Sequence, residues 1–219
     1  MKRFFPMSVA LAASLTLTAC VPNEMSVQLV HATVPDVDGD TGSCLADPSG
    51  TPVAAGFFDV GATNAFLWQS FTAKNNMEVN TDEGSERLNS RDFIIERAVV
   101  SYGAVEQDLQ GLMESLGERE TPMSGTIEAG GDAGIWVNIV PRDVSAVLAS
   151  EGSLSDPSAR ATIIVNTQIE GHMQNGQGLF SSTVSFPVEI CNRCMFCAGG
   201  VEPAAWSCGS PGRYPGLCL

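Results

Sequence analysis

Two long segments near the end of the chain, Ala161–Met173 and Leu179–Ile190, alternate between apolar and polar residues. This period of two places every second side chain on the same face of a β-strand. Asn175-Gly176 lies between the segments and supplies the positive φ angles that a two-residue hairpin turn needs. We therefore predict an antiparallel hairpin with one buried and one solvated face. Pro187 lacks an N–H, so the second strand is expected at an edge or with a bulge there. The residues of this strand expected to face the core are Phe180, Val184, Phe186, Val188 and Ile190.

Four more segments have the apolar and aromatic composition of short strands. They are Val53–Val60, Ala65–Thr72, Phe93–Tyr102 and Ile135–Val140. In Phe93–Tyr102 the side chains expected on one face are Ile94, Ala98, Val100 and Tyr102. Apolar residues at helical spacing predict two short connecting helices, near Val105–Leu116 and Asp143–Ala149. The predicted fold class is mainly β: a single antiparallel β-sandwich over residues 53–190 with one or two short helices.

The first twenty residues have the pattern of an export signal. Lys2 and Arg3 precede an apolar run, Phe4–Leu17, which is too short to cross a bilayer as a helix. Leu17-Thr18-Ala19-Cys20 then resembles the lipobox of bacterial lipoproteins. The resemblance implies a signal peptide over residues 1–19, cleavage before Cys20, lipid on its sulfur and acylation of the new amino terminus. A plain secretion signal with Cys20 as a structural thiol is the alternative.

Residues 20–52 are expected to form the lipidated cysteine and an acidic flexible tether. The segment is rich in Pro, Gly, Asp, Ser and Thr and has no regular periodicity, although Val27–Ala32 could form one short strand. By analogy with well-studied enteric lipoproteins, a valine at position 21 instead of aspartate favours the outer membrane over the inner one. The predicted location is therefore the cell envelope, with the lipid bilayer as a partner.

The cysteine count agrees with a lipidated Cys20. The chain has seven cysteines, and an odd number would leave one thiol unpaired in an oxidising compartment. The remaining six can form three disulfides: Cys44, Cys191, Cys194, Cys197, Cys208 and Cys218. Because five of the six lie in the tail, residues 191–219, complete pairing requires a bond from Cys44 to that tail. Such a bond would stabilise the fold by roughly 4–5 kcal/mol in the chain-entropy model. Fifteen pairings remain open.

The closely spaced cysteines Cys191, Cys194 and Cys197 allow three interpretations. A ferredoxin-type cluster would need a fourth cysteine where Val201 stands, and a zinc site would need a second close pair. A thioredoxin-like redox pair would need a helix directly after it, where Ala198-Gly199-Gly200 follows. Structural disulfides are favoured, with a metal-binding or thiol–disulfide function as the alternative, and no cofactor is expected.

Charge restricts the partners. Without residues 1–19 the chain has nine basic and 25 acidic residues, a net charge of −16, and Lys74 is its one lysine. Nucleic acid is therefore not an expected partner, since phosphate binding needs clustered basic residues. Asp36, Asp38 and Asp40 resemble the opening of a calcium loop and suggest a calcium-dependent adhesin, but Thr41 stands where the loop needs glycine. A solvated acidic tether is the simpler interpretation.

No catalytic motif is evident in the sequence. His31 lies in the expected tether, and His172 lies on the expected solvent-exposed face of a strand. Neither a nucleophile elbow nor a zinc-protease motif occurs in the sequence. Trp206, Arg213 and Tyr214 are residue types enriched at binding hot spots, although they equally suit packing of the tail.

The layout resembles uncharacterised exported bacterial lipoproteins, with a lipobox, a tether, an immunoglobulin-like β-sandwich and a cysteine-rich tail. This resemblance implies a non-enzymatic module that binds another envelope protein or a surface polymer.

Overall fold

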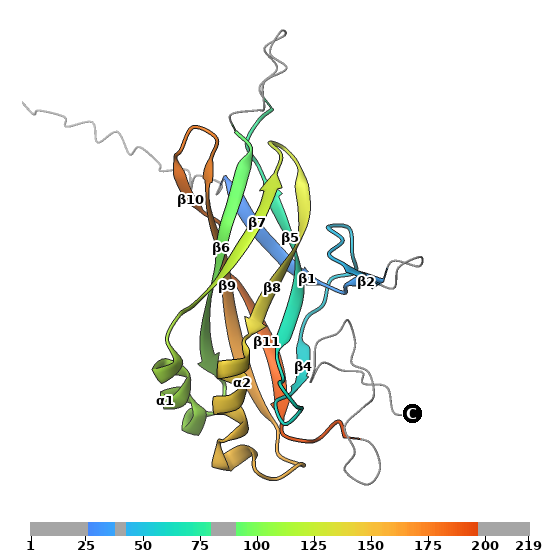
Figure 1. Ribbon diagram of the computed structural model, residues 1–219, viewed down its shortest axis with the longest axis vertical. Coiled ribbons are helices and arrows are strands. Elements are labelled where there is room, and N and C mark those ends of the chain that lie inside the picture. Colours follow the sequence, from blue (N-terminus) through green and yellow to red (C-terminus); the bar gives the residue numbers. More distant parts are fainter. Residues whose placement is uncertain (1–25, 38–42, 80–90, 197–219) are drawn as a thin grey trace, which may run out of the picture.

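The computed structural model describes residues 26–37, 43–79 and 91–196, and these form a mainly β protein (Figure 1). The strands are β1 (Val27–Thr33), β2 (Asp36–Val37), β3 (Cys44–Leu45), β4 (Gly56–Asp59), β5 (Leu67–Asn75), β6 (Phe93–Ala104), β7 (Arg119–Ile127), β8 (Asp132–Val140), β9 (Ala161–Met173), β10 (Gly178–Phe180) and β11 (Val184–Cys191). The helices are α1 (Gln107–Leu116), α2 (Arg142–Ala149) and one 3₁₀ turn, η1 (Gly152–Leu154). None of the helices in these ranges has the length and apolar character needed to cross a membrane.

The strands form two larger sheets and one short ribbon. A three-stranded sheet has the order β1-β5-β8, and a six-stranded sheet has the order β4-β11-β9-β6-β7 with β10 also paired to β9. The ribbon consists of β2 and β3. The prediction of a mainly β fold is confirmed, but the sheets are not all antiparallel, because β4 runs parallel to β11. Both predicted helices are present, and Figure 1 shows them at the lower end, opposite the β9–β10 turn.

Both larger sheets contribute to one hydrophobic core. Phe71 on β5 meets Phe186 on β11 edge to face, with ring centroids 6.2 Å apart and an interplanar angle of 78°. From the lower end, Leu109 and Met113 of α1 and Leu148 of α2 enter the same cluster. Each helix buries residues three or four positions apart, which is the spacing of one helical face.

The predicted hairpin is present, but its turn is longer than expected. The N–H of Met173 donates to the carbonyl of Gln177 at 2.9 Å, and the N–H of Gly176 donates to the carbonyl of Met173 at 2.8 Å. Gly176 has a φ of 84°, whereas Asn175 has no positive φ. The connection is therefore a three-residue loop, a β-turn followed by one left-handed glycine, and not the two-residue turn that the sequence suggested.

The second strand of the hairpin is interrupted between β10 and β11. Across this interruption the buried and exposed positions change places. Phe180 pairs with Glu170 and Val184 pairs with Thr167, so the return side has one residue more than β9 between these pairs. Phe180 is consequently 59% exposed, not core-facing as predicted, and Ser181 is buried. Pro187 lies inside β11 at a point that β4, which pairs from Val188 onward, does not reach.

A second inserted residue changes the faces of β6. Ile95 pairs with Gly171 and Arg97 with Glu170, which leaves Glu96 as the extra residue of a β-bulge. Before the bulge the buried side chains are Phe93 and Ile95; after it they are Ala98, Val100 and Tyr102. The prediction that Ile94 shares a face with Ala98, Val100 and Tyr102 is therefore wrong. The inserted residue moves the side chains before the bulge to the opposite face from those after it.

Part of the segment expected to be a tether belongs to the folded body. Val27–Thr33 is strand β1, paired with β5, and its Val27, Leu29 and Ala32 are buried. The hydroxyl of Thr72 donates to the carbonyl of Pro48 at 2.9 Å, so the chain beyond β3 also contacts β5. Strand β7 was not predicted from the sequence, because its side chains are largely polar and exposed.

Candidate functional site

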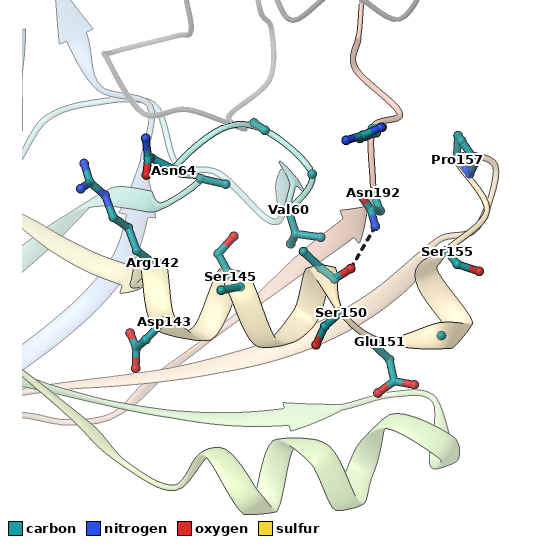
Figure 2. Close-up of a pocket in the computed structure, with 17 residues that line it drawn as sticks. Val60, Asn64, Arg142, Asp143, Ser145, Ser150, Glu151, Ser155, Pro157 and Asn192 are labelled. Carbon is teal, nitrogen blue, oxygen red and sulfur yellow. Dashed lines mark hydrogen bonds between the residues drawn. The ribbon is translucent and has the colours of Figure 1, made fainter.

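A cavity of about 750 Å³ lies at the lower end of the molecule (Figure 2). Its walls are α2 with the residues that follow it, 150–157, the segment 60–65 after β4, and residues 192–193 after β11. The volume falls within the range of small-ligand sites, roughly 300–1,000 Å³. Asn64, in the 60–65 wall, has a φ of 55°, a left-handed conformation that asparagine tolerates better than most residues.

The parallel pairing of β4 and β11 brings two of these walls together. Asp59 is opposite Cys191 in the ladder, so both strands release their chains at the same end of the sheet. The N–H of Val60 donates to the carbonyl of Cys191 at 2.8 Å and extends this pairing by one residue. Two segments more than a hundred positions apart in the sequence therefore leave the sheet side by side.

The carboxylate of Asp59 fixes both segments. Asp59 is fully buried, and its Oδ1 accepts the N–H groups of Gly61 at 2.9 Å and Arg193 at 2.7 Å. Its Oδ2 accepts the N–H of Met195 at 2.8 Å. Hydrogen bonds from backbone N–H groups are how a buried carboxylate is stabilised without a cationic partner. Asp59 thus holds the start of the 60–65 segment and the 193–195 loop on one side chain.

A disulfide closes that loop between Cys191 and Cys194. Cys191 is fully buried, whereas Cys194 is half-buried. Arg193 lies between them with a φ of 58°, in the left-handed region that non-glycine residues seldom adopt. A carboxylate oxygen of Asp59 and the two sulfur atoms all lie within 4.8 Å of one another. While the disulfide is intact, neither sulfur is a thiolate that could bind a metal ion.

Cys44 is disulfide-bonded as well. Cys20, Cys197, Cys208 and Cys218 all lie outside those residues, so the predicted lipidation and the remaining pairings stay predictions.

The cavity presents polar groups more than charged ones. Ser145 on α2 is 2% exposed, and its hydroxyl has no hydrogen-bond partner within the described part of the chain. Figure 2 shows this hydroxyl pointing from α2 toward the segment 60–65. Asn192 closes the opposite side, where its Nδ2 donates to the carbonyl of Ala149 at 3.2 Å. A buried hydroxyl without a partner is costly to the fold.

The charged residues of the walls are arranged asymmetrically. Figure 2 shows the carboxylates of Asp143 and Glu151 pointing away from the segment 60–65. Asp143 instead forms an ion pair with Arg119 at 3.1 Å. Arg142 points toward Asn64, and its guanidinium lies 5.2 Å from the centre of the Phe66 ring. Arg193 also lines the cavity, so in a strongly acidic protein its walls carry neutral polar side chains and two arginines.

Of the other candidate residues, those that the structure describes do not line this cavity. Asp36 lies in β2 opposite Leu45, and Asp38 and Asp40 lie outside the described residues. Trp206, Arg213 and Tyr214 also lie outside them. His172 lies 3.1 Å from a carboxylate oxygen of Glu96 on the exposed face of the six-stranded sheet, and His31 lies in β1 opposite Thr72.

Sequence reasoning missed Asp59, Ser145 and Asn192 as site residues. One signal was available for Asp59: it is the single charged residue of the apolar segment Val53–Val60. A charge inside a buried strand must be paired or hydrogen-bonded, so it marks a position with a defined role.

Fold and site together define a mainly β protein with a polar cavity where one helix meets the ends of two parallel strands. A scan against protein-family models found no match, and a search of the curated proteins found no significant match.

Proposed function

We propose that this chain is a lipid-anchored protein of the bacterial cell envelope, in the outer membrane, that binds another envelope component without catalysing a reaction. The lipobox residues Leu17–Cys20 support the anchor. The body is proposed to be an immunoglobulin-like β-sandwich. The contact between Phe71 and Phe186 and the core shared by the two sheets support that description.

The observation that carries the binding function is the cavity and its hydrogen-bonding side chains. Its lining includes the neutral hydrogen-bonding side chains of Asn64, Ser150 and Asn192 and two arginines, Arg142 and Arg193. The carboxylates of Asp143 and Glu151 point outward. Such a lining suits a hydroxyl-rich ligand better than an apolar one, because apolar ligands gain affinity from buried apolar walls. We therefore assign the cavity to a segment of a surface glycan.

A steric block of the cavity tests this binding site. Gly152 lines the cavity, and a Cβ added there meets no atom within 4 Å, so Gly152→Phe should fold normally and fill the site. We expect the soluble form, residues 21–219, to lose at least about ten-fold in affinity for glycan purified from the envelope, equivalent to about 1.4 kcal/mol. The measurement is retention of size-fractionated glycan on immobilised protein.

Gly111→Phe is the matched control for this experiment. Gly111 is an exposed position on α1 with the same open space around an added Cβ, and it does not line the cavity. Equal binding by both variants and the unmodified protein would place the glycan elsewhere on the surface. The unmodified protein could instead fail to bind glycan and capture an envelope protein. If only Gly152→Phe lost that capture, the ligand would be a protein and not a glycan.

The lipid anchor predicts a specific phase behaviour. Mature protein isolated from cells should begin at an acylated Cys20 and partition into detergent, because each buried methylene contributes about 0.8 kcal/mol and two or more chains give a stable anchor. Cys20→Ser should remain in the aqueous phase, and Cys44→Ser, which also removes one thiol, should not. An intact mass without acyl chains, or with residues 1–19 retained, would contradict the anchor.

A further inference from the structure

The two sulfurs of the Cys191–Cys194 bridge are unequally accessible. Cys191 is fully buried, with its Sγ 3.9 Å from the carbonyl oxygen of Phe58, whereas Cys194 is half-buried. Thiol–disulfide exchange begins with attack of a thiolate on one sulfur, so access selects Cys194. The exposed guanidinium of Arg193, the preceding residue, adds positive charge on the side from which an anionic thiolate would approach.

The bridge is not what holds its surroundings in place. Cys191 remains in the ladder through its pairing with Asp59 and through the hydrogen bond from Val60 to its carbonyl. A disulfide that spans three positions also contributes least to stability in the chain-entropy model, which scales with loop length. Opening it should leave the sheets intact and release the residues between the sulfurs.

Those residues are part of the cavity wall. Asn192 and Arg193 both line the cavity, and Asn192 is hydrogen-bonded to the carbonyl of Ala149 at the end of α2. They also fit closely against the facing wall: a Cβ added to Gly61 would lie 2.2 Å from the Oδ1 of Asn192 and 2.6 Å from the backbone nitrogen of Arg193. A change in the loop is therefore transmitted to the segment 60–65.

We propose that Cys191–Cys194 is a thiol–disulfide exchange site for a protein dithiol, and that its redox state sets the shape of the cavity wall. One thiolate of the dithiol attacks the Sγ of Cys194, the S–S bond breaks, and Cys191 leaves and takes up a proton. The second thiolate of the dithiol attacks the mixed disulfide, and the Sγ of Cys194 leaves and is protonated. Two electrons and two protons reach the bridge, and the dithiol becomes a disulfide.

Asp59 is the positioning residue of this site. Its hydrogen bonds to the N–H groups of Arg193 and Met195 hold the loop, and its carboxylate opposes negative charge on the adjoining Cys191. The site is independent of the proposed glycan, since exchange requires only the loop and Asp59.

Two variants of the mature protein, each with one cysteine replaced by serine, test which sulfur is attacked. Oxidised glutathione is the probe. Cys191→Ser should form a mixed disulfide at Cys194, and Cys194→Ser should react at Cys191 roughly ten-fold more slowly because that sulfur is buried. Trypsin cleaves after Arg193 and separates the two positions onto peptides 161–193 and 194–213. Equal rates, or no adduct at Cys194, would overturn the assigned site.

The unmodified protein provides a measurement that does not depend on variant folding. During titration with dithiothreitol, alkylation should appear at Cys191 and Cys194 before Cys44, with the far-ultraviolet circular dichroism unchanged. Amide hydrogen exchange in residues 61–65 should then become roughly ten-fold faster, because the close fit of Gly61 against Asn192 and Arg193 is lost. If the bridge opens only when the sheets unfold, or if exchange in 61–65 does not change, the proposal fails. Neither readout uses the glycan, so failure here is distinct from failure of the proposed function.

Discussion

Replacing Phe71 by alanine is expected to lower the free energy of unfolding by about 3–5 kcal/mol, the usual cost of removing a buried phenylalanine ring. Phe71 is fully buried on the central strand of the three-stranded sheet, between Ala32 of β1 and Ile135 of β8. Its ring also meets Phe186 of the other sheet. The variant loses apolar burial and leaves a cavity at the point where the two sheets meet.

Phe180→Ala is the matched control for this experiment, because it removes the same ring from a position that is 59% exposed. It should change the free energy of unfolding by no more than about 0.5 kcal/mol. Chemical denaturation with a common m-value for all three proteins provides the measurement. Similar losses for the two variants would mean that Phe71 does not join the sheets as described.

Gly171→Ala is expected to be destabilising by about 3 kcal/mol, at the upper end of the usual cost of overpacking. A Cβ at this position would lie 2.0 Å from the carbonyl oxygen of Ile94, a backbone atom that cannot move aside alone. Gly171 pairs with Ile95 directly before the bulge at Glu96, and the bulge brings the carbonyl of Ile94 over it. The alanine would force β9 and β6 apart in the middle of the six-stranded sheet.

Gly178→Ala provides the comparison for Gly171→Ala. Gly178 lies in β10 of the same hairpin, and an added Cβ there meets no atom within 4 Å. Its substitution should be neutral within about 0.5 kcal/mol. Thermal unfolding of the two variants side by side tests both statements, and a neutral Gly171→Ala would show that the bulge is absent or lies elsewhere along β6.

The elements with strong periodicity were predictable from the sequence. Which of their side chains face the core was not predictable where a residue is inserted. Alternation in Ala161–Met173 predicts β9 with its buried side correct throughout. In β6 and along the return strand, one inserted residue exchanges the faces, at Glu96 and between Phe180 and Val184. A bulge is set by pairing with neighbouring strands, so a single segment read alone does not reveal it.

Polar composition concealed β7. It is an exposed strand whose polar side chains give no alternation signal, and its order comes from pairing with β6. A short strand at Val27–Ala32 was suggested by the sequence, but its place in the folded body was not, because residues 20–52 are rich in Pro, Gly and Asp. Pairing with β5 and the buried side chains of β1 attach it to the three-stranded sheet. In both cases tertiary contacts decide the structure and local preference does not.

The candidate site was only partly accessible to sequence reasoning. The spacing of Cys191 and Cys194 suggested chemistry, yet nothing in the sequence joined them to Asp59, 132 positions before Cys191. That neighbourhood arises from the parallel pairing of β4 with β11, a long-range contact without a local signature. Ser145 was also inconspicuous, because a serine on a helix is usually solvated.

The place of β11 between β9 and β4 has a consequence for biogenesis. β4 is synthesised early, but it pairs with β11, the last strand that the structure describes. During synthesis or export, β4 therefore stays unpaired until residue 191 has emerged. Sheets completed by such distant segments form slowly and expose apolar edges meanwhile. This protein should therefore depend on a holding chaperone during its maturation, and a version truncated before Val184 should be degraded instead of accumulating.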